Sequence, residues 1–383
     1  MQLKVILKIF RVCFQIISSI VCCLLVLGCC TYLVGFGGEL PSLDPASDVS
    51  MMDRFDHLIF SPLKEAEEAA YSVPKQFWIP ENATKGPIPN PKSYGTATDP
   101  SSLQWLLDEA QTILDGQETL FSPQIVLMPG TELTYYLDET IFAITWKQVI
   151  DDAVFTISEI KISHPSQFRR HILDSTFDGP MLAIPSEMAP AVNAVVGTSA
   201  DHYRGRRAGI IVYDGEVKRI DLPHHIDVCY VDLNGDLHFS YRGQLLDRES
   251  AQKFVDDNQI SFSIAFGPIL VDNGVRCEPP AYQLGEVNDR YARAALCQMG
   301  PLHYLVVAAN IEAGYWNHLD IHQFAEKIAA FGCEKAYTLD GGNTASIVMN
   351  NKLINRTTFG YERLQGDLLY FCTALPDHKE QNK

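Results

Sequence analysis

The arrangement in this chain best suited to chemistry is a carboxylate followed by two glycines, Asp340-Gly341-Gly342, at the end of an apolar, strand-like run. Glycine has no Cβ atom, so the backbone can bend sharply there and approach a ligand closely. A carboxylate on such a bend can act as a general acid, a general base or an orienting group, and we expect its side chain to be exposed. Asn343 and Thr344 extend the turn with polar groups. The same residues also suit a plain Asp-Gly hairpin.

A second group of polar residues lies upstream, where Asp201 and Tyr203 precede Arg204, Arg206 and Arg207. The guanidinium group presents a planar fork of N–H donors that matches phosphate oxygens. This basic cluster therefore suits an anionic substrate, although a solvated basic loop would have the same composition.

Arg293 is the only charged residue in the run Tyr291–Leu296. Burying a charge without a partner is costly, so its guanidinium must either be paired inside the protein or face a ligand. Both an anion site and an internal salt bridge satisfy this requirement.

Metal sites are a rival chemistry. His318 and His322 are four residues apart, as two ligands on one helical face can be, but no HExxH motif accompanies them. The series Asp232, Asn234 and Asp236 begins like a calcium loop and stops short, so a hairpin explains it better. The Ser-nucleophile, P-loop and Rossmann motifs are absent from the sequence. We expect neither a metal nor a cofactor.

The turn Leu339–Thr344 belongs to a longer ordered pattern. Its other members are a Phe-Gly-Pro segment, an Arg-bearing strand, a polar hairpin and a Glu-Arg pair ahead of a closing apolar strand: Phe266–Gly274, Tyr291–Leu296, Asn350–Lys352, Glu362, Arg363 and Asp367–Phe371. This order resembles the phosphodiester glycosidase family, from about Tyr135 to Phe371. That family includes an enzyme that removes N-acetylglucosamine from a phosphodiester on mannose, and bacterial exopolysaccharide-associated surface proteins.

The resemblance implies hydrolysis of a glycosidic bond to a phosphodiester-linked sugar. It implies catalytic roles for Asp340, as acid or base, and for Asp201, as a second carboxylate. Arg293 is expected to bind the phosphate. The other residues implied in substrate binding are Tyr203, Gly341, Gly342, Asn343, Thr344, Glu362 and Arg363.

Several positions depart from the family pattern. Ser199 and Ala200 stand where the family has Asn and Gly, and Ala309 and Ile311 stand where it has an acidic and a basic residue. These changes remove side chains that could bind sugar or organise charge. A non-catalytic envelope protein that binds polysaccharide or assists its assembly is therefore the alternative to an enzyme.

The N-terminal segment predicts a location. Lys4, Lys8 and Arg11 precede a stretch without charge, residues 12–38, long enough to cross a bilayer core of about 30 Å. Basic residues on its N-terminal side predict a retained single-pass signal anchor in the cell membrane, with the C-terminal domain extracytoplasmic. A cleaved signal peptide and a lipoprotein signal near Val26–Cys29 are alternatives. The net charge of -17 argues against nucleic acid as a partner. The expected partners are a sugar phosphodiester or cell-surface glycan and the membrane.

Periodicity predicts the fold. Hairpin signals at Asp214-Gly215 and Asn234-Gly235 alternate with helical spacing over residues 319–331 and a short helix over residues 167–171. This mixture predicts an α+β fold with mixed, mainly antiparallel sheets and a few helices, preceded by one N-terminal transmembrane helix. The predicted divisions are a cytoplasmic start and anchor, a linker and helical stalk, a glycosidase-like domain and a polar tail: residues 1–38, 39–134, 135–374 and 375–383.

Overall fold

The computed structural model describes residues 85–173, 182–221, 226–279, 289–312 and 314–376. The chain divides into two units, Met1–Ser72 and Val73–Lys383, and all described residues belong to the second unit. The expected membrane anchor and the start of the linker lie outside the described residues, as do the last residues of the polar tail. Within the described ranges, no helix has the length and apolar character needed to cross a bilayer.

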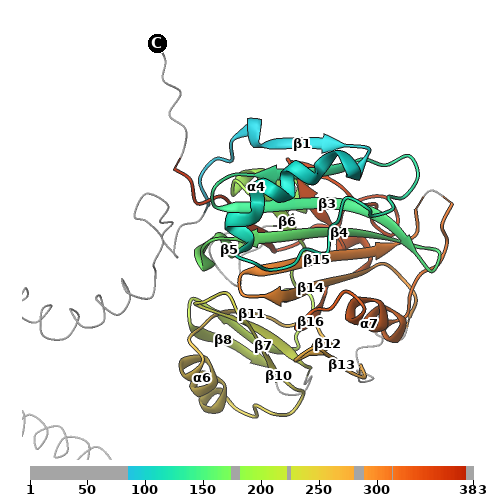
Figure 1. The fold of residues 1–383 in the computed structure, drawn as a ribbon. Helices are drawn as coiled ribbons and strands as arrows, with labels where there is room; N and C mark the ends of the chain where they lie inside the picture. Colours follow the sequence, from blue (N-terminus) through green and yellow to red (C-terminus); the bar gives the residue numbers. More distant parts are fainter. Residues whose placement is uncertain (1–84, 174–181, 222–225, 280–288, 313, 377–383) are drawn as a thin grey trace, which may run out of the picture. The chain divides into compact units, whose positions relative to one another are not determined.

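A nine-stranded antiparallel sheet is the largest element of the described fold (Figure 1). In spatial order its strands are β1 (Tyr94–Ala97), β2 (Leu133–Leu137), β3 (Ile141–Ile150), β4 (Ala153–Ile162), β15 (His303–Asn310), β14 (Arg293–Gly300), β16 (Lys335–Leu339), β12 (Ile269–Asp272) and β13 (Val275–Arg276). β3 and β4 pair in register from Ile141↔Ile162 to Ile150↔Ala153. Asp151 and Asp152, both with positive φ, form the tight turn between them.

Two five-stranded antiparallel sheets complete the strand structure. One has the order β10 (Leu237–Ser240), β9 (Val228–Asp232), β11 (Ile260–Ile264), β7 (Gly209–Tyr213) and β8 (Glu216–Asp221). The other has the order β18 (Lys352–Leu353), β17 (Ile347–Met349), β6 (Val196–Thr198), β19 (Asp367–Phe371) and β5 (Phe168–Ile172). The strand pairs all lie antiparallel wherever the structure describes them, as the hairpin signals predicted.

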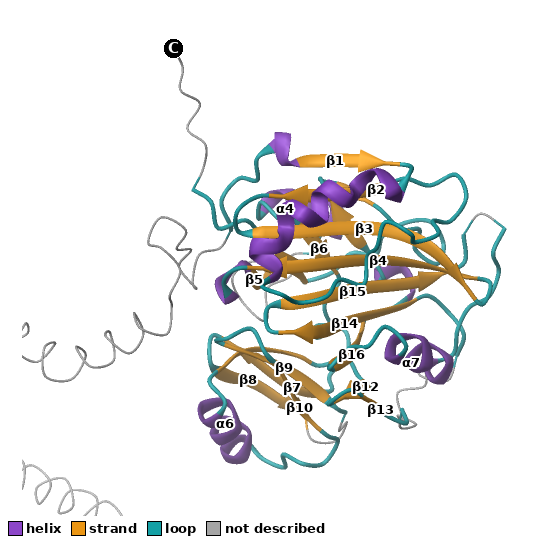
Figure 2. Cartoon of the chain, in the orientation of Figure 1, coloured by secondary structure: helices purple, strands orange, loops and turns teal. Residues whose placement is uncertain are grey.

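Four α-helices accompany the sheets in the described ranges (Figure 2): α4 (Gln104–Leu114), α5 (Pro185–Ala191), α6 (Arg248–Asp257) and α7 (Ile321–Ala329). α6 and α7 begin at capping boxes, in which Asp247 and Asp320 accept from backbone N–H groups that would otherwise lack partners. The 3-10 turns are η2 (Pro91–Ser93), η3 (Pro100–Leu103), η4 (Pro165–Gln167) and η7 (Gly342–Thr344).

Both faces of the large sheet are buried. Along β14, Ala294 and Leu296 face one apolar cluster, which includes residues of β6, β17 and β19. Ala295 and Cys297 face another, which includes α4 and α7. Burial on both faces explains why the central strands are almost continuously apolar rather than alternating.

The observed elements agree with most of the sequence predictions. The α+β class with mainly antiparallel sheets is confirmed, as are the hairpins at Asp214-Gly215 and Asn234-Gly235. The short helix expected over residues 167–171 is wrong, because Phe168–Ile172 pairs as β5 with β19, a partner about two hundred positions later in the chain. The folded unit also begins earlier than the expected boundary at residue 135, since β1 pairs with β2 and α4 contributes to the core.

Candidate active site

The Asp-Gly-Gly turn follows β16 directly and is fixed by backbone hydrogen bonds on both sides. The N–H of Asp340 donates to the carbonyl of Ala200 (3.0 Å), and the N–H of Gly342 donates to the carbonyl of Ala292 (2.8 Å). A Cβ atom at Gly341 would lie 2.5 Å from that Ala292 carbonyl oxygen, and Gly342 has φ +65°. The two glycines are therefore needed for close approach and for a left-handed backbone, as the sequence indicated.

Asp340 itself is more enclosed than the sequence suggested. Its exposed fraction is 5%, where a carboxylate on an exposed turn was expected. The reason lies in two segments far away in sequence. Residues 199–202 lie against one side of the turn, where the Ser199 hydroxyl also donates to the Asp340 carbonyl oxygen (3.3 Å), and Arg363 covers the carboxylate.

Two charged or titratable side chains, those of Arg363 and His202, lie at the Asp340 carboxylate. The guanidinium of Arg363 donates from Nη2 to Oδ2 of Asp340 (2.5 Å). His202 Nδ1 lies 4.0 Å from the same oxygen and 3.3 Å from Arg363 Nη2. Since Arg363 can only donate, Nδ1 of His202 is the acceptor in that contact. The side chains of Arg363 and His202 are 43% and 38% exposed, so ligands can reach this carboxylate–guanidinium–imidazole cluster.

The segment 357–363 is bound to the Asp-Gly-Gly turn through Asn343. The Arg363 N–H donates to the Asn343 carbonyl (3.1 Å), and the Phe359 N–H donates to Asn343 Oδ1 (2.8 Å). The Thr344 hydroxyl closes the turn on the Gly341 carbonyl (2.5 Å). The polar residues after the glycines therefore fix the segment that carries Arg363.

Asp201, expected as a second catalytic carboxylate, is fully enclosed. Its Oδ1 accepts from the Tyr203 N–H (2.9 Å) and from Arg170 Nη2 (3.0 Å), and its Oδ2 accepts from the Ala265 N–H (2.8 Å). The Asp201 side chain has no exposed surface. These bonds hold the run 200–203 in place, so we infer that Asp201 positions its neighbours Ala200 and His202 at the turn.

Arg170 is the buried counterion of two carboxylates. Besides Asp201 it contacts Asp367, with Nη2 2.5 Å from Oδ2, and its Nη1 donates to the Ser263 carbonyl. Burial alone would lower the pKa of Arg170, but the two carboxylates raise it. Burial raises the pKa of Asp367 to about 7, with the nearby negative charge of Asp201 adding to the rise and Arg170 opposing it.

The side chain of Arg293 lies on the opposite face of the large sheet from that of its neighbour Ala294. Its neighbour Ala294 pairs with Leu339, so its backbone lies close to the Asp-Gly-Gly turn. However, its guanidinium contacts the carbonyls of Leu319 and Asp289 and lies 4.2 Å from the Tyr291 ring centroid. Desolvation lowers its pKa. The Leu319 contact supports the segment before α7, and the other two support the segment before β14. Phosphate binding by Arg293 stays a prediction.

Other residues implicated by the sequence have internal contacts. Glu362 accepts from the backbone N–H and hydroxyl of Ser186 at the start of α5 (2.9 and 2.5 Å). Arg204 donates to the Tyr203 hydroxyl (2.9 Å), and Arg206 donates to the Phe266 carbonyl (3.1 Å). The upstream basic cluster is therefore largely engaged within the fold, apart from the exposed Arg207.

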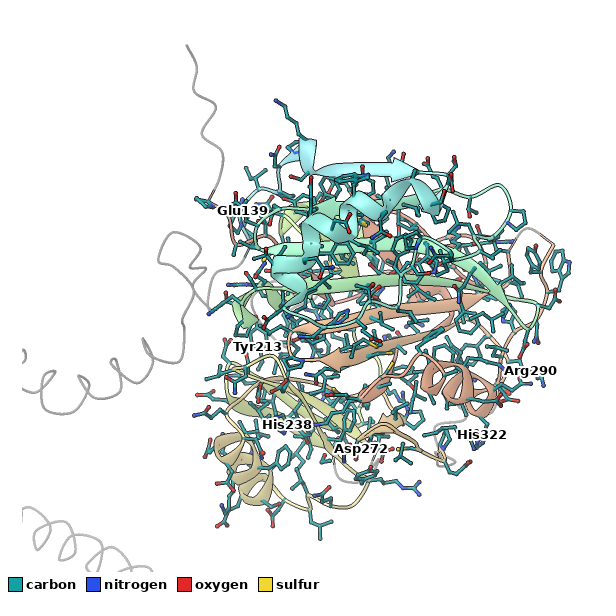
Figure 3. The ribbon with its side chains drawn as sticks, viewed as in Figure 1. Glu139, Tyr213, His238, Asp272, Arg290 and His322 are labelled. Atoms are coloured by element: carbon teal, nitrogen blue, oxygen red, sulfur yellow. The ribbon has the colours of Figure 1, made fainter. Side chains whose placement is uncertain are left out.

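The rival metal chemistry gains no geometric support in the described part of the chain, which contains no grouping of three or more potential ligands. His322, labelled in Figure 3, lies in the first turn of α7. The His322 ring lies 3.6 Å from Glu278, and both side chains are more than half exposed. Asp232 instead accepts from the N–H groups of Asn234 and Asp236, as a hairpin turn requires. A second histidine pair in the sequence, His224 and His225, lies outside the described residues.

Sequence reasoning missed two contributors to the charged clusters. Arg170 and His202 gave no signal, because nothing in the local sequence shows that they meet Asp201 and Asp340. Asn310 ends β15 and donates to the Arg356 carbonyl (2.5 Å), while its buried Oδ1 has no hydrogen-bond partner among the residues that the structure describes. Asn310 lies between the two positions, Ala309 and Ile311, that depart from the family pattern.

The fold is thus an α+β domain whose antiparallel sheets bring a carboxylate, a guanidinium and an imidazole together on a glycine turn. Residues 189–372 match the model of the phosphodiester glycosidase family, NAGPA. The matched segment includes Asp201, His202, Asp340 and Arg363, whereas Arg170 lies before it. No curated protein sequence is similar enough to match this chain.

Among the solved structures that are similar to this chain are two with low sequence identity. A hypothetical protein from Synechocystis has 13% identity and a TM-score of 0.43, over 61% of this chain and 62% of that one. The catalytic domain of zebrafish N-acetylglucosamine-1-phosphodiester alpha-N-acetylglucosaminidase, auto-inhibited by its pro-peptide, has 15% identity and a TM-score of 0.44, over 68% of this chain and 92% of that one. The chain therefore spans less than two thirds of the Synechocystis protein.

Proposed function

We propose that this protein is a glycosidase that hydrolyses the bond between a sugar and a phosphodiester. The observation that carries the proposal is the cluster of Asp340, Arg363 and His202 on the Asp-Gly-Gly turn, within the segment that matches the phosphodiester glycosidase family. The carboxylate supplies an acid–base group, and the two partly exposed nitrogen-bearing side chains suit an anion.

The chemistry explains why these residue types belong together. In the proposed reaction, the oxygen of water bonds to the anomeric carbon while the bond from that carbon to the phosphate oxygen breaks. The electron pair stays on the phosphate, and Asp340 accepts the proton that water loses. A phosphodiester monoanion thereby becomes a phosphomonoester dianion. Positive groups that meet this extra charge stabilise the transition state more than the substrate.

Arg363 is better placed than Arg293 to bind the phosphate. Its guanidinium is partly exposed and contacts Asp340 directly, whereas Arg293 is 2% exposed and is turned toward the segment before α7. A guanidinium that already contacts the carboxylate can exchange part of that contact for a phosphate oxygen, because it has five N–H donors. Asp340 would then accept the proton on its carboxylate.

The test is turnover of N-acetylglucosamine phosphodiester model compounds by the purified full-length protein, with release of the sugar as the signal. A broad panel of sugar phosphodiesters without detectable turnover would contradict the proposal. In parallel, calorimetric titration with a sugar phosphate that the protein does not hydrolyse measures binding alone.

A second candidate function is a non-catalytic polysaccharide-binding or assembly protein. The replacement of charged family positions by Ala309 and Ile311 favours it. Between them lies Asn310, whose Oδ1 has no partner within the described ranges. This hypothesis predicts measurable binding of sugar phosphates and no turnover by either the wild type or Asp340→Asn.

We further propose that the uncharged segment 12–38 anchors the domain to the outer side of a cell membrane, where a cell-surface glycan is the expected partner. Protease added to intact cells should then digest the domain. Protection in intact cells with digestion after lysis would contradict this topology.

A further inference from the structure

The imidazole ring of His202 lies directly against Gly205, three residues later in the chain. A Cβ atom at Gly205 would lie 2.0 Å from Nε2 of His202, 2.6 Å from Cε1 and 2.7 Å from Cδ2. All of these separations are far shorter than a van der Waals contact between heavy atoms. The ring therefore occupies the space that the side chain of any other residue at this position would need.

The backbone conformation does not explain why this residue is a glycine. Glycine is commonly required where φ is positive, as it is at Gly209 and Gly360. The φ angle of Gly205 lies outside that left-handed region, so it does not exclude alanine. Gly205 is also exposed, and the nearest atoms to its missing Cβ all belong to His202. The ring of His202 is therefore what leaves no room for a side chain.

The turn that carries the ring is held by hydrogen bonds. The Arg206 N–H donates to the His202 carbonyl (2.8 Å), which folds the chain back under the ring. Arg219 Nη2 donates to the carbonyls of Tyr203 and Arg206 (2.7 and 3.4 Å). The Tyr203 N–H donates to the buried carboxylate of Asp201 (2.9 Å). Because these bonds fix the backbone, an added Cβ atom would displace the imidazole rather than the turn.

Another edge of the same ring faces the Asp340 cluster. His202 Nδ1 lies 4.0 Å from Oδ2 of Asp340 and accepts from Arg363 Nη2 (3.3 Å). Since Nδ1 is an acceptor there, the proton of the neutral ring is on Nε2, the atom nearest to the missing Cβ of Gly205. The imidazole is rigid, so a rotation that relieves a contact at Nε2 also turns Nδ1 from its place beside Asp340 and Arg363.

We propose that Gly205 is a positioning residue, whose lack of a Cβ atom keeps the His202 imidazole beside Asp340 and Arg363. The inference rests on the proposed function, in which this imidazole helps to bind the phosphate. A ring that already rests on a fixed backbone has less freedom to lose when a ligand binds. Alanine at this position should turn the ring away and weaken the site, while the fold is kept because only a partly exposed side chain has to move.

A double-mutant cycle tests the role in turnover of N-acetylglucosamine phosphodiesters. His202→Ala should lower kcat/KM roughly tenfold, the size of one hydrogen bond to a charged group. Gly205→Ala should cause most of the same loss, and the variant with both substitutions should be no worse than His202→Ala alone. Losses that multiply in the double variant, or a Gly205→Ala variant as active as wild type, would overturn the positioning role.

Gly300→Ala is the matched control. Its φ also lies outside the left-handed region, and its Cβ would lie 2.9 Å from Oε1 of Gln117, again the end of a side chain, but at the end of β14 away from the Asp-Gly-Gly turn. It should leave kcat/KM unchanged. If Gly205→Ala does not fold, the double variant decides, because it lacks the ring and should fold as His202→Ala does. A double variant that is also unfolded would reject the proposal.

A spectroscopic measurement separates this inference from the proposed catalysis, because it needs no turnover. In the NMR spectrum of the full-length protein, Asp340→Asn should shift the His202 ring signals, since it removes a carboxylate 4.0 Å from Nδ1. The same substitution should cause a much smaller shift in Gly205→Ala. The ring of His303, bonded to Glu159 (2.9 Å), is the internal reference. If no phosphodiester is hydrolysed but this difference appears, the glycosidase proposal fails and the positioning role stands. Equal shifts in both backgrounds would refute it.

Discussion

Two clusters in this protein use the same kinds of side chain in opposite ways. Arg170, Asp201 and Asp367 form a guanidinium–carboxylate group without exposed side-chain surface. Arg363 and Asp340 form another, joined by His202, at which the guanidinium is 43% exposed. The two are linked, because Asp201 and His202 are adjacent and the Ala200 carbonyl accepts from the Asp340 N–H.

Burial decides what each cluster can do. Within the buried cluster each charge depends on its partners, because removing one leaves an uncompensated charge at low dielectric. Such a group holds segments together but cannot meet a ligand. The partly exposed cluster can exchange protein contacts for ligand contacts at little cost. We infer that the buried cluster positions the run 200–203 and that the exposed cluster performs the chemistry.

The largest expected effect is on activity at the exposed cluster. If Asp340 is the acid–base group, Asp340→Asn should lower kcat on sugar phosphodiesters by roughly 10²–10⁴. The amide keeps the size of the side chain and an oxygen for Arg363, so the melting temperature should change little. Asp257→Asn, on the exposed face of α6, is the control. Equal kcat for Asp340→Asn and wild type would reject Asp340 as the acid–base group.

Removal of the buried cation should instead act on stability. Arg170→Met leaves Asp201 and Asp367 without their counterion, and we expect the free energy of unfolding to fall by about 3–5 kcal/mol. Denaturant titration measures it. Lys253→Ala, which breaks an exposed pair with Asp257, should cost less than about 1 kcal/mol. Similar small losses for both variants would show that the buried cluster has no special positioning role.

A smaller effect is expected at the exposed guanidinium. Arg363→Ala removes one charge-assisted hydrogen bond, worth about 1.5–3 kcal/mol, so kcat/KM should fall roughly 10- to 150-fold. The loss should be less with neutral glycosides than with phosphodiesters, because the guanidinium is proposed to bind the phosphate. Arg293→Ala should show no such substrate dependence if its role is to support the segment before α7. If instead Arg293→Ala, and not Arg363→Ala, lost more activity on phosphodiesters than on neutral glycosides, phosphate binding would be assigned to Arg293.

A further expected effect is a pH dependence of stability. The pKa of Asp367 rises from 3.8 to about 7 on folding, so the folded state holds its proton more tightly than the unfolded state. The contribution of Asp367 to the free energy of unfolding is fully present when the pH is below its unfolded-state pKa. It falls as the pH rises toward the folded-state pKa of about 7 and is constant at higher pH. The free energy of unfolding of Asp367→Asn, relative to wild type, should therefore increase across this window. A decrease would mean that Arg170 controls the carboxyl more strongly than burial does.

Much of the local structure is determined by the sequence. Asp214-Gly215 and Asn234-Gly235 predict their hairpins because such turns need residues that tolerate positive φ, as Asp214, Gly215 and Gly235 do. The spacing of Phe324, Ala325 and Ile328 predicts α7. The Asp-Gly-Gly turn belongs to this class. Its glycines are required by the local backbone, so the sequence alone identified the turn and the carboxylate on it.

Only the tertiary structure decided which side chains meet that carboxylate. His202 and Arg363 are 161 residues apart, and both reach Asp340 because β6 and β16 end close together and Asn343 holds the segment of Arg363. The sequence likewise did not show which way the Arg293 side chain points. In the structure, side chains alternate along β14, so Arg293 lies on the face opposite Ala294. The exposure of a carboxylate depends on segments that pack over it from elsewhere in the chain, and a local pattern does not contain that information.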